Sequence, residues 1–423
     1  KTVELENPKI IGQVILTTSN MSVAALVEIL QTNKTQYWNK LIKYDKGIRT
    51  VSVLKELEVS KETSTVAFKD YGVYLITGGM GGIGFLFAKE IIKQTAKAKL
   101  LLVGRTELTP ERKKMLTSLS ASGRSVTYRR VDITNAEQVN NLIASIRSDH
   151  KQLNGILHCA GINIDNFILK KSLEEFQNVL QPKVVGLFNL DHASANLDLD
   201  FVALFSSVAS WLGNVGQVDY ATANGFMDQF AIYRNALVKN KERKGQTLSI
   251  NWPLWQEGGM SMHQSIQKTL EDATGLRPLE KSEGFLNFYR GLASGYDQIM
   301  VMAGDYVQIR DLLSKPHSGH QQALSITKGS ITHMERTDLF EKAQTFICKQ
   351  LAGQLKLSVD QLDPRAPLER YGIDSILSMD LTSQLEKTFG SLPKTLFFEY
   401  QTIHELTAYF VNTYTDYLTD LLF

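Results

Sequence analysis

The chain has 423 residues, which is too long for one ordinary domain and predicts two or three. Its 46 Lys and Arg residues nearly balance 44 Asp and Glu residues, and this formal charge of +2 argues against a dedicated nucleic-acid binder. Two cysteines exclude a disulfide scaffold and fit a reducing compartment, and no apolar run has the length of a membrane span. We therefore expect a cytoplasmic protein. Because the first residues lack an initiator Met, we also expect a segment of a longer polypeptide.

Residues 1–70 hold a helical pattern at 23–30 and a candidate strand at 50–53, but no cluster of reactive side chains. From Gly72 to about residue 304, apolar β-branched runs alternate with helical patterns. The expected strands lie at residues 73–77, 100–103, 125–131, around 157, 201–205, 247–251 and 299–302, and a helix follows the first of them at 85–95. Such near-continuous Val, Ile and Leu runs are typical of strands buried on both faces. The alternation predicts a doubly wound, parallel, Rossmann-like α/β sheet.

Residues 314–336 are polar and rich in helix breakers, which predicts an interdomain linker. Beyond the linker the pattern is helical, with apolar stripes at 339–351 and 376–389 and a last helix at about 403–418. From residue 337 onward, seven Lys and Arg residues stand against twelve Asp and Glu residues. From the helical pattern we place an all-α domain at residues 337–423. Its excess of acidic residues disfavours DNA binding.

A glycine-rich loop follows the first strand and opens the first helix. It reads Thr77-Gly78-Gly79-Met80-Gly81-Gly82-Ile83-Gly84. Without β-carbons, the backbone of such a loop can approach a pyrophosphate, whose charge the helix N-terminus stabilises. A purely structural turn is the alternative, but the strand–loop–helix context favours a dinucleotide site.

Two side chains at strand ends indicate which dinucleotide is bound. Arg105 follows the second strand, where NAD enzymes place an acid, and its guanidinium suits the 2′-phosphate of NADPH. A surface cation is the alternative reading of Arg105. Asp132 ends the third strand and could accept a hydrogen bond from an adenine amine.

Four side chains fit carbonyl reduction. Tyr220 and Asn224 are four residues apart and share one helix face, Ser207 ends the preceding strand, and Lys183 lies in the helix before that strand. Reduction needs a proton donor, for which we assign Tyr220, and a donor that polarises the carbonyl, for which we assign Ser207. The Lys183 ammonium would lower the pKa of the phenol, and Asn224 would position Lys183 or a relay water. Taken singly, such a Tyr is usually a core residue and such a Ser a helix cap.

With these residues the sequence resembles the ketoreductase domain of modular polyketide synthases, a branch of the short-chain dehydrogenase/reductase superfamily. The resemblance covers about residues 45–310. The matching segments are the loop at 77–84, Asp132, residues 158–161, 181–183, 205–207, 216–220, Asn224 and 251–260. In this branch Lys precedes the Ser and Tyr, and Asn stands four residues after Tyr, as here.

The resemblance implies further assignments. Residues 1–70 look like the C-terminal part of a non-catalytic structural subdomain, and residues 71–313 like the catalytic domain. Ile133, Ala160 and Gly161 join the residues expected to contact NADPH. We interpret Cys159 as a small buried side chain and not as a nucleophile. No metal site is assigned.

The alcohol configuration is read from two positions. Relatives that give one configuration carry Leu-Asp-Asp after Ala-Gly, and Asn163-Ile164-Asp165 keeps the final Asp. Relatives of the opposite configuration carry Trp where this chain has Leu212, with Trp211 one place away. We therefore expect the D-configured (B-type) alcohol, with Asp165 as its marker.

Residues 337–412 resemble an acyl carrier protein, with Gly372-Ile373-Asp374-Ser375-Ile376 before a helix and Leu392–Tyr400 after it. On local grounds Ser375 could be an ordinary N-cap. The resemblance implies instead that Ser375 bears 4′-phosphopantetheine, attached by a phosphopantetheinyl transferase. The stretch 392–400 looks most like carriers of bacterial assembly lines that use a trans-acting acyltransferase.

The resulting interpretation is a ketoreductase–carrier didomain that reduces the β-keto group of an acyl thioester on its own carrier, between upstream and downstream polyketide synthase domains. We expect neither a nucleic-acid partner nor a membrane span. One alternative is a catalytically silent reductase that docks its carrier. Another is a free-standing short-chain alcohol dehydrogenase with an unrelated helical appendage.

Overall fold

The computed structural model describes residues 1–18, 20–57, 68–120, 125–259, 267–268, 271–272, 274–314, 333–373 and 375–423, without the side chains of residues 314, 333–336, 375 and 376. The chain divides into two compact units, which we describe separately. One unit comprises Val53–Asn166 and Lys170–Lys315, and the other comprises Lys1–Ser52, Phe167–Leu169 and Pro316–Phe423. The domain boundaries expected from the sequence stay predictions. The expected linker, apart from residues 314 and 333–336, lies outside the described residues.

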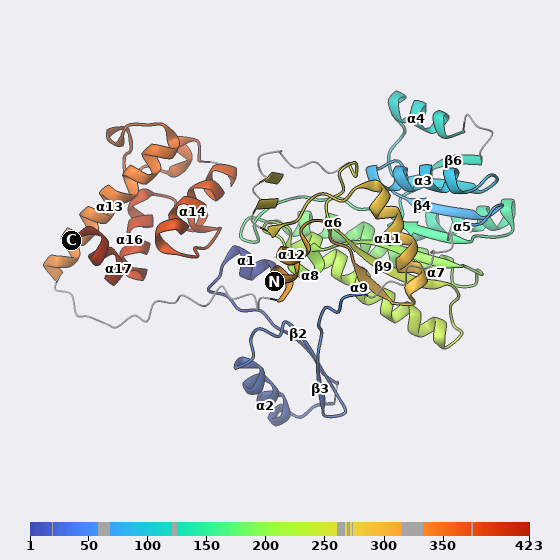
Figure 1. The fold of residues 1–423 in the computed structure, drawn as a ribbon, viewed down its shortest axis with the longest axis horizontal. Coiled ribbons are helices and arrows are strands. Elements are labelled where there is room, and N and C mark those ends of the chain that lie inside the picture. The colour runs from blue at the N-terminus through green and yellow to red at the C-terminus, as the bar shows by residue number, and fades with distance from the viewer. Residues whose placement is uncertain are drawn as a thin grey trace. The chain divides into compact units, whose positions relative to one another are not determined.

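The larger unit is a layered α/β structure (Figure 1). Its elements in chain order are β4 (Val73–Thr77), α3 (Gly82–Gln94), β5 (Lys99–Gly104), α4 (Pro110–Ser120), β6 (Ser125–Arg130), α5 (Ala136–His150), β7 (Gly155–His158), α6 (Leu173–Lys183), α7 (Val185–Ala193), β8 (Phe201–Ser207), α8 (Ala209–Leu212), α9 (Val218–Lys239), β9 (Gln246–Trp252), α11 (Lys281–Ser294), β10 (Gln298–Met300) and α12 (Tyr306–Ser314).

Among the described residues, seven strands form one sheet in the order β10-β9-β8-β7-β4-β5-β6, and every neighbouring pair is parallel. The chain enters at β4, continues outward through β5 and β6, and then returns to β7 on the other side of β4. The strand order therefore reverses between β4 and β7. In open parallel sheets, ligands bind at the carboxyl ends of the strands beside such a reversal. The doubly wound fold expected from the sequence is confirmed.

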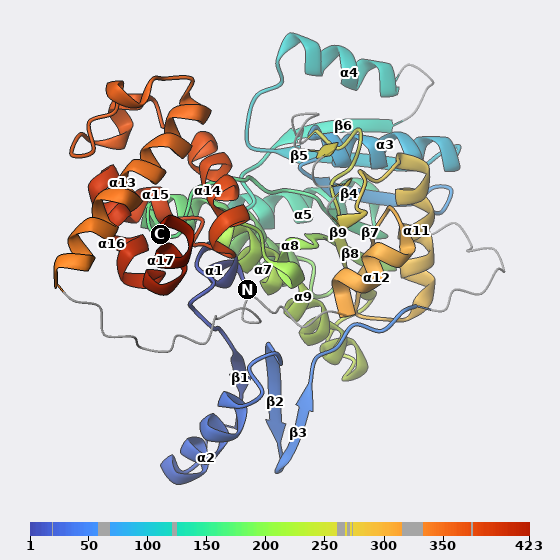
Figure 2. The ribbon, with the colours of Figure 1, turned by 60° about the vertical axis from the view of Figure 1, so that its left-hand side comes forward.

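The two faces of the sheet are covered by different helices (Figure 2). Along β4, Tyr74 and Ile76 pack with α3 and α11, whereas Val73 and Leu75 pack with α5, α7 and α9. All four side chains are at most 1% exposed. Burial on both faces is the physical reason for the continuous apolar runs in the sequence.

The residues before the larger unit form α1 (Thr2–Glu6), β1 (Val14–Leu16), α2 (Val23–Lys34), β2 (Leu41–Asp45) and β3 (Ile48–Val51). Within the described chain, β1 pairs parallel with β2, and β3 pairs antiparallel with β2. The sequence predicted α2 and β3 and missed β1 and β2. β1 has three residues and carries exposed apolar side chains such as Val14, and β2 has only one buried side chain, Ile42, so neither has the continuous buried pattern that identifies a core strand.

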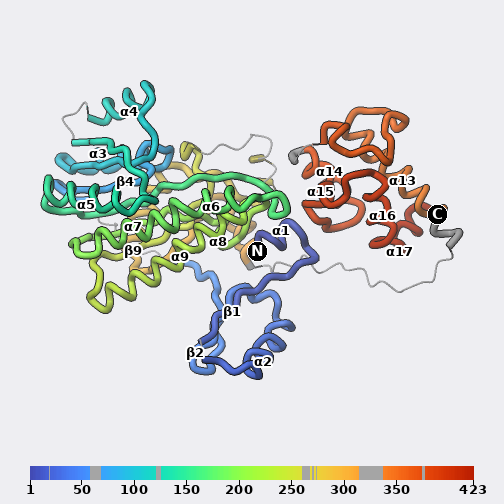
Figure 3. The backbone as a smooth tube through the Cα atoms, turned by 180° about the vertical axis from the view of Figure 1, so that it is seen from behind, coloured from blue at the N-terminus to red at the C-terminus, as the bar shows by residue number. Residues whose placement is uncertain are grey.

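The C-terminal residues fold into helices α13 (His333–Leu355), α14 (Ser375–Phe389), α15 (Leu396–Glu399), α16 (Ile403–Thr413) and α17 (Thr415–Leu422), as Figure 3 shows from behind. Short 3-10 helices lie at Val359–Gln361 and Leu368–Tyr371. The core of this helical domain contains Leu351, Leu385, Leu396 and Phe410, each at most 2% exposed. An all-α C-terminal domain is confirmed.

The single helix expected over residues 403–418 is wrong. The helix α16 ends at Thr413, and its C-cap residue, Tyr414, has φ −128° and ψ 35°. The ring of Tyr414 packs 5.5 Å from that of Phe389 and 5.7 Å from that of Phe410, measured between centroids. Tertiary packing of this ring turns the chain, so α17 begins as a separate helix at Thr415. None of the helices in the described part of the chain is long and apolar enough to cross a membrane.

Candidate functional site

Tyr220 lies in the first turn of α9, and Ser207 is the last residue of β8. Hydrogen bonding to the side chains of Ser207 and Asn224 acts to lower the pKa of the Tyr220 phenol, so both side chains lie near it. Asn224 lies one turn further along α9, is fully buried, and donates from Nδ2 to the backbone oxygen of Tyr220 at 2.7 Å. Its Oδ1 has no hydrogen-bond partner among the described residues. The structure therefore brings three of the four expected residues together.

Lys183, the fourth residue, ends α6 and is 3% exposed. Its Nζ donates to the Phe205 backbone oxygen at 3.0 Å and lies 5.7 Å from the centroid of the Tyr220 ring. Phe205 belongs to β8, the strand that ends in Ser207, so one strand end positions both Lys183 and Ser207. All four residues thus meet at the carboxyl end of β8.

Burial acts on both titratable groups. Desolvation lowers the pKa of Lys183 from 10.5 to about 8, although the nearby charge of Asp228 opposes the shift. Desolvation also raises the pKa of Tyr220, which its hydrogen bonds to Ser207 and Asn224 oppose. The net direction for Tyr220 is opposite to the lowering that we expected from Lys183. A raised pKa keeps the phenol protonated at neutral pH, as a proton donor must be.

The pKa of Lys183 predicts a pH dependence of carbonyl reduction. As the pH rises through about 8, the ammonium loses its proton, so we expect kcat/KM to fall. A Lys183→Met variant should have lower activity at pH 7 and should lack this decline. The measurement is a pH profile of both proteins, and an unchanged decline in the variant would assign it to another group.

The glycine loop lies between β4 and α3, beside the end of β7. Gly78 has φ +63°, and a β-carbon there would lie 2.9 Å from the Ala160 Cα. A β-carbon on Gly82 would lie 2.0 Å from the Gly258 oxygen, so the backbone of a second loop passes directly over α3 at its first residue. Gly81 is the N-cap of α3, and this end of the helix can receive a phosphate. These close backbone approaches fit a dinucleotide-binding loop.

The loop is continuous with Tyr220, Ser207, Asn224 and Lys183, which we call the reducing group after their expected role. Ala160, which Gly78 contacts, precedes Gly161, and a β-carbon on Gly161 would lie 2.8 Å from Cε of Lys183. Thr77 is fully buried, and its Oγ1 lies 2.8 Å from Nδ1 of His158 at the end of β7. Gly79 and Met80 lie in the turn before α3, with Met80 in the core, and Ile83 and Gly84 lie in the first turn of α3.

Arg105 follows β5 directly and is exposed. Its backbone oxygen accepts a hydrogen bond from Nε of Arg130, the last residue of β6. Two guanidinium groups therefore lie at neighbouring strand ends, although we had singled out only Arg105. Asp132 lies two residues beyond β6, where its Oδ1 accepts hydrogen bonds from the Thr134 backbone and hydroxyl. Ile133 is buried in the core, so only its backbone can face a ligand.

Asp165 is exposed on the loop between β7 and α6. Its charge raises the pKa of Tyr220, which places it within electrostatic range of the phenol. Cys159 is partly buried, and desolvation raises the pKa of its thiol, consistent with an unreactive small side chain. Met260, the last residue of the matching segment 251–260, lies outside the described residues.

Sequence reasoning missed a buried polar network behind the site. Asp228 is 4% exposed and accepts hydrogen bonds from Ser210, Ser249 and Asn251 at 2.6, 2.6 and 2.9 Å. Asn251 Nδ2 also donates to the Ser207 backbone oxygen at 3.1 Å. The sequence held a pattern that could have identified Asp228, because this residue continues the four-residue spacing of Tyr220 and Asn224 along α9.

Ser375 is the first residue of α14, the position expected of a residue that carries a phosphodiester at a helix N-terminus. Gly372 precedes it with φ +74°, ending the 3-10 helix Leu368–Tyr371. Asp374 and the side chain of Ser375 lie outside the described residues.

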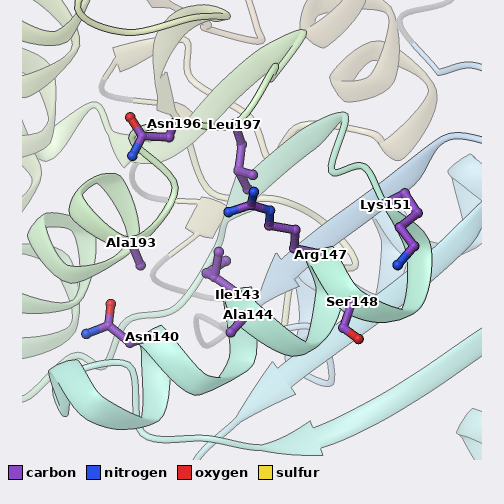
Figure 4. Close-up of a pocket in the computed structure, with 9 residues that line it drawn as sticks. All are labelled: Asn140, Ile143, Ala144, Arg147, Ser148, Lys151, Ala193, Asn196 and Leu197. Atoms are coloured by element: carbon purple, nitrogen blue, oxygen red, sulfur yellow. The ribbon is translucent and has the colours of Figure 1, made fainter.

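A separate depression of about 510 Å³ lies between α5 and the residues after α7 (Figure 4). Its lining includes Arg147 and Lys151 of the α5 end and Leu197, just before β8. These residues precede the amino ends of β7 and β8. The depression is therefore at the edge of the sheet opposite to the reducing group.

Comparisons with known proteins show which families and relatives this chain is similar to. Residues 72–257 match the family model "KR domain", and residues 345–410 match "Phosphopantetheine attachment site". A crystal structure of a ketoreductase domain from the bacillaene assembly line is 41% identical, with a TM-score of 0.71 over 74% of this chain and 74% of that chain. An N-terminal ketoreductase from the macrolactin assembly line is 35% identical, with a TM-score of 0.63 over 74% of this chain and 60% of that one.

Two polyketide synthases of Bacillus subtilis (strain 168) match almost the whole chain. PksL is 43% identical over 100% of this chain, and PksN is 40% identical over 99%. The chain spans only 10% and 8% of their respective lengths. The reductase family implies NADPH as cofactor, and the attachment-site family implies 4′-phosphopantetheine. This chain belongs to the ketoreductase family of polyketide synthases, an oxidoreductase domain followed in the same chain by a phosphopantetheine carrier domain.

Proposed function

We propose that this chain uses NADPH to reduce the β-keto group of a polyketide acyl thioester, bound through phosphopantetheine on Ser375, to a D-configured β-hydroxyacyl thioester. The observation that carries the proposal is the group formed by Tyr220, Ser207, Asn224 and Lys183 at the end of β8, continuous with the glycine loop. A phenol, a hydroxyl and an ammonium in one buried place are the donors that carbonyl reduction requires.

The residues present fit NADPH. Gly81 caps the N-terminus of α3, where a pyrophosphate would lie, and Arg105 offers a charge for the 2′-phosphate. The close approaches of Gly78 to Ala160 and of Gly82 to Gly258 require glycine in this turn. Asp132, Ala160 and Gly161 would line the rest of the cofactor site. When bound, NADPH supplies the hydride for the carbonyl carbon.

The chain's own residues would supply the remaining chemistry. The Ser207 hydroxyl donates a hydrogen bond to the carbonyl oxygen and polarises it. Tyr220 holds its proton at neutral pH because burial raises its pKa, and it donates this proton to the oxygen as negative charge develops there. The Lys183 ammonium, 5.7 Å from the centre of the phenol ring, stabilises the phenolate that results. Asn224 holds the first turns of α9 together through its bond to the Tyr220 backbone.

The D configuration is supported by Asp165, whose charge acts on the pKa of the phenol, and by Leu212 in place of the Trp found in relatives of opposite outcome. The test is to supply the full chain with NADPH and a β-ketoacyl thioester, and to follow NADPH consumption and the chirality of the alcohol. We expect consumption and the D alcohol. The L alcohol would overturn the configuration alone, whereas an intact protein that consumes no NADPH would overturn the reductase function.

The choice of NADPH over NADH is tested at Arg105. Removing a cation that contacts a phosphate costs on the order of tenfold in affinity when the site is exposed, so Arg105→Ala should raise KM for NADPH about tenfold. KM for NADH should change little, because NADH lacks the 2′-phosphate. Arg147→Ala, an exposed arginine at the far edge of the sheet, is the matched control. Equal effects on both cofactors would remove Arg105 from phosphate recognition.

The partners follow from the carrier domain. A phosphopantetheinyl transferase would modify Ser375, a trans-acting acyltransferase would supply the extender unit, and adjacent polyketide synthase domains would deliver and remove the acyl chain. The matches to PksL and PksN, which this chain resembles over nearly all its residues, support such an assembly line.

A further inference from the structure

Lys171 and Asp219 form a buried ion pair next to the reducing group. The Lys171 Nζ lies 2.7 Å from Oδ2 of Asp219, and their side chains are 3% and 0% exposed. Lys171 follows the loop after β7, and Asp219 lies in α9, 48 residues later in the sequence. The pair therefore joins two segments that the chain brings together only on folding.

Lys171 and Asp219 each form a second hydrogen bond, to a backbone group next to a residue of the proposed reaction. Lys171 Nζ donates to the Ile164 oxygen at 2.6 Å, next to Asp165. Asp219 Oδ1 accepts from the Tyr220 backbone N–H at 2.8 Å. A continuous path of charged hydrogen bonds thus runs from the Ile164 carbonyl to the amide of the proposed proton donor.

The first turn of α9 needs such support. Tyr220 is the third residue of this helix, and helix ends fray unless they are capped. The N-cap residue, Gln217, makes no side-chain capping bond within the described chain. A carboxylate in the first turn is stabilised by the free N–H groups and the helix dipole, so Asp219 takes over part of the capping role.

The loop that carries Asp165 needs support as well. Asp165 is exposed, so burial of its side chain does not fix the loop. Two backbone bonds hold it: the Ile164 oxygen to Lys171, and the Asn166 N–H to the Gly216 oxygen at 2.9 Å. The second bond attaches the loop directly to the residues before α9, and the first attaches it to Lys171, whose charge pairs with Asp219 in α9.

A buried ion pair is costly, because removing both charges from water offsets most of their attraction. Two apolar side chains of similar volume would stabilise the fold at least as well. What they could not do is donate to the Ile164 oxygen and accept from the Tyr220 N–H. The advantage of the ion pair over apolar side chains is therefore that it fixes the positions of these two backbone groups.

We propose that Lys171 and Asp219 are positioning residues, which hold the Asp165 loop and the first turn of α9 in register and so determine which face of the bound ketone meets the reducing group. This inference rests on the proposed reductase function for its stereochemical consequence. The positioning itself is independent of that function.

The experiment compares three variants of the full chain. Lys171→Met removes the bond to Ile164 and leaves Asp219 unpaired. Lys171→Met with Asp219→Asn removes both charges but keeps an acceptor for the Tyr220 N–H, so it is expected to fold even if the single variant does not. Lys244→Met breaks the exposed Lys244–Asp198 ion pair and is the matched control.

In the double variant we expect at least a fivefold rise in the fraction of the minor alcohol, and a kcat for reduction lowered about tenfold. KM for NADPH should stay unchanged, because the glycine loop and Arg105 do not touch the pair. The control should match the wild type. A folded double variant with the wild-type alcohol ratio and kcat would overturn the proposal, since a purely stabilising pair would change neither below the unfolding temperature.

Hydrogen exchange supplies a readout that needs no substrate. Backbone amides of residues 160–168 should exchange about tenfold faster in the double variant than in the wild type or the control, because the Ile164 anchor is gone. Unchanged exchange would overturn the positioning role. If the wild type reduced no β-ketoacyl thioester, the proposed function would fail, and the exchange rates would still decide the role of the pair.

Discussion

Replacing Tyr220 with phenylalanine is expected to lower kcat for β-ketoacyl thioester reduction by about 10²- to 10⁴-fold, the usual contribution of a positioned general acid. Phenylalanine keeps the ring and loses only the hydroxyl, whose pKa responds to the side chains of Ser207 and Asn224. The remaining donors can still polarise the carbonyl, so a residual rate is expected. Initial rates of NADPH consumption with a saturating thioester measure the effect.

The control for this substitution is Tyr233→Phe, an exposed tyrosine on the same helix, which should retain wild-type activity. NADPH affinity should be nearly the same in both variants, because the glycine loop and Arg105, and not the Tyr220 hydroxyl, are the groups proposed to bind NADPH. A Tyr220→Phe protein that kept full activity would assign the proton to another group. A wild type that bound NADPH without consuming it would favour the silent, carrier-docking alternative.

The second large effect is expected at Ser375. After incubation with coenzyme A and a phosphopantetheinyl transferase, the wild type should gain the mass of one phosphopantetheine, and Ser375→Ala should gain none. The loss is complete because alanine has no oxygen to form the phosphodiester. Intact mass spectrometry measures it, and Ser383→Ala, an exposed serine on the same helix, is the matched control.

The substitutions at Ser375 and Tyr220 distinguish the function of the carrier domain from that of the reductase domain. Ser375→Ala should abolish reduction of a carrier-tethered chain but leave reduction of a free β-ketoacyl thioester unchanged. Tyr220→Phe should impair both. A mass gain that persisted in Ser375→Ala would remove the carrier assignment and favour a free-standing reductase acting on a diffusible substrate.

The elements and site residues that were predicted correctly depend on local features of the sequence, such as apolar runs and helical spacing. The first strand was expected at 73–77 and is found at Val73–Thr77, because each of its residues is buried on one of two covered faces. Ser207 was expected at a strand end, and Tyr220 and Asn224 on one helix face, and both expectations hold because they depend only on strand termini and helical spacing. Recognising the whole set needed the resemblance to a family, since each residue alone has a common structural explanation.

The features that could not be predicted from the sequence depend on packing between distant segments. The Lys171–Asp219 pair joins residues 48 positions apart, and no periodicity in either segment indicates the other. The rise in the pKa of Tyr220 also follows from burial, which depends on every element around the phenol. The break at Tyr414 is a local event with a tertiary cause, the packing of its ring against Phe389.

The amino-acid sequence alone determined the parallel sheet, the helical C-terminal domain and the glycine loop, because periodicity and residue spacing encode which residues share a face or a strand end. Grouping Tyr220, Ser207, Asn224 and Lys183 as candidate reducing residues also needed the resemblance to a family. Only the tertiary structure decided which charges are buried together, how the Asp165 loop is anchored, and in which direction the site shifts its own pKa values. Those properties depend on desolvation and on distances between side chains, and both arise only when the segments pack.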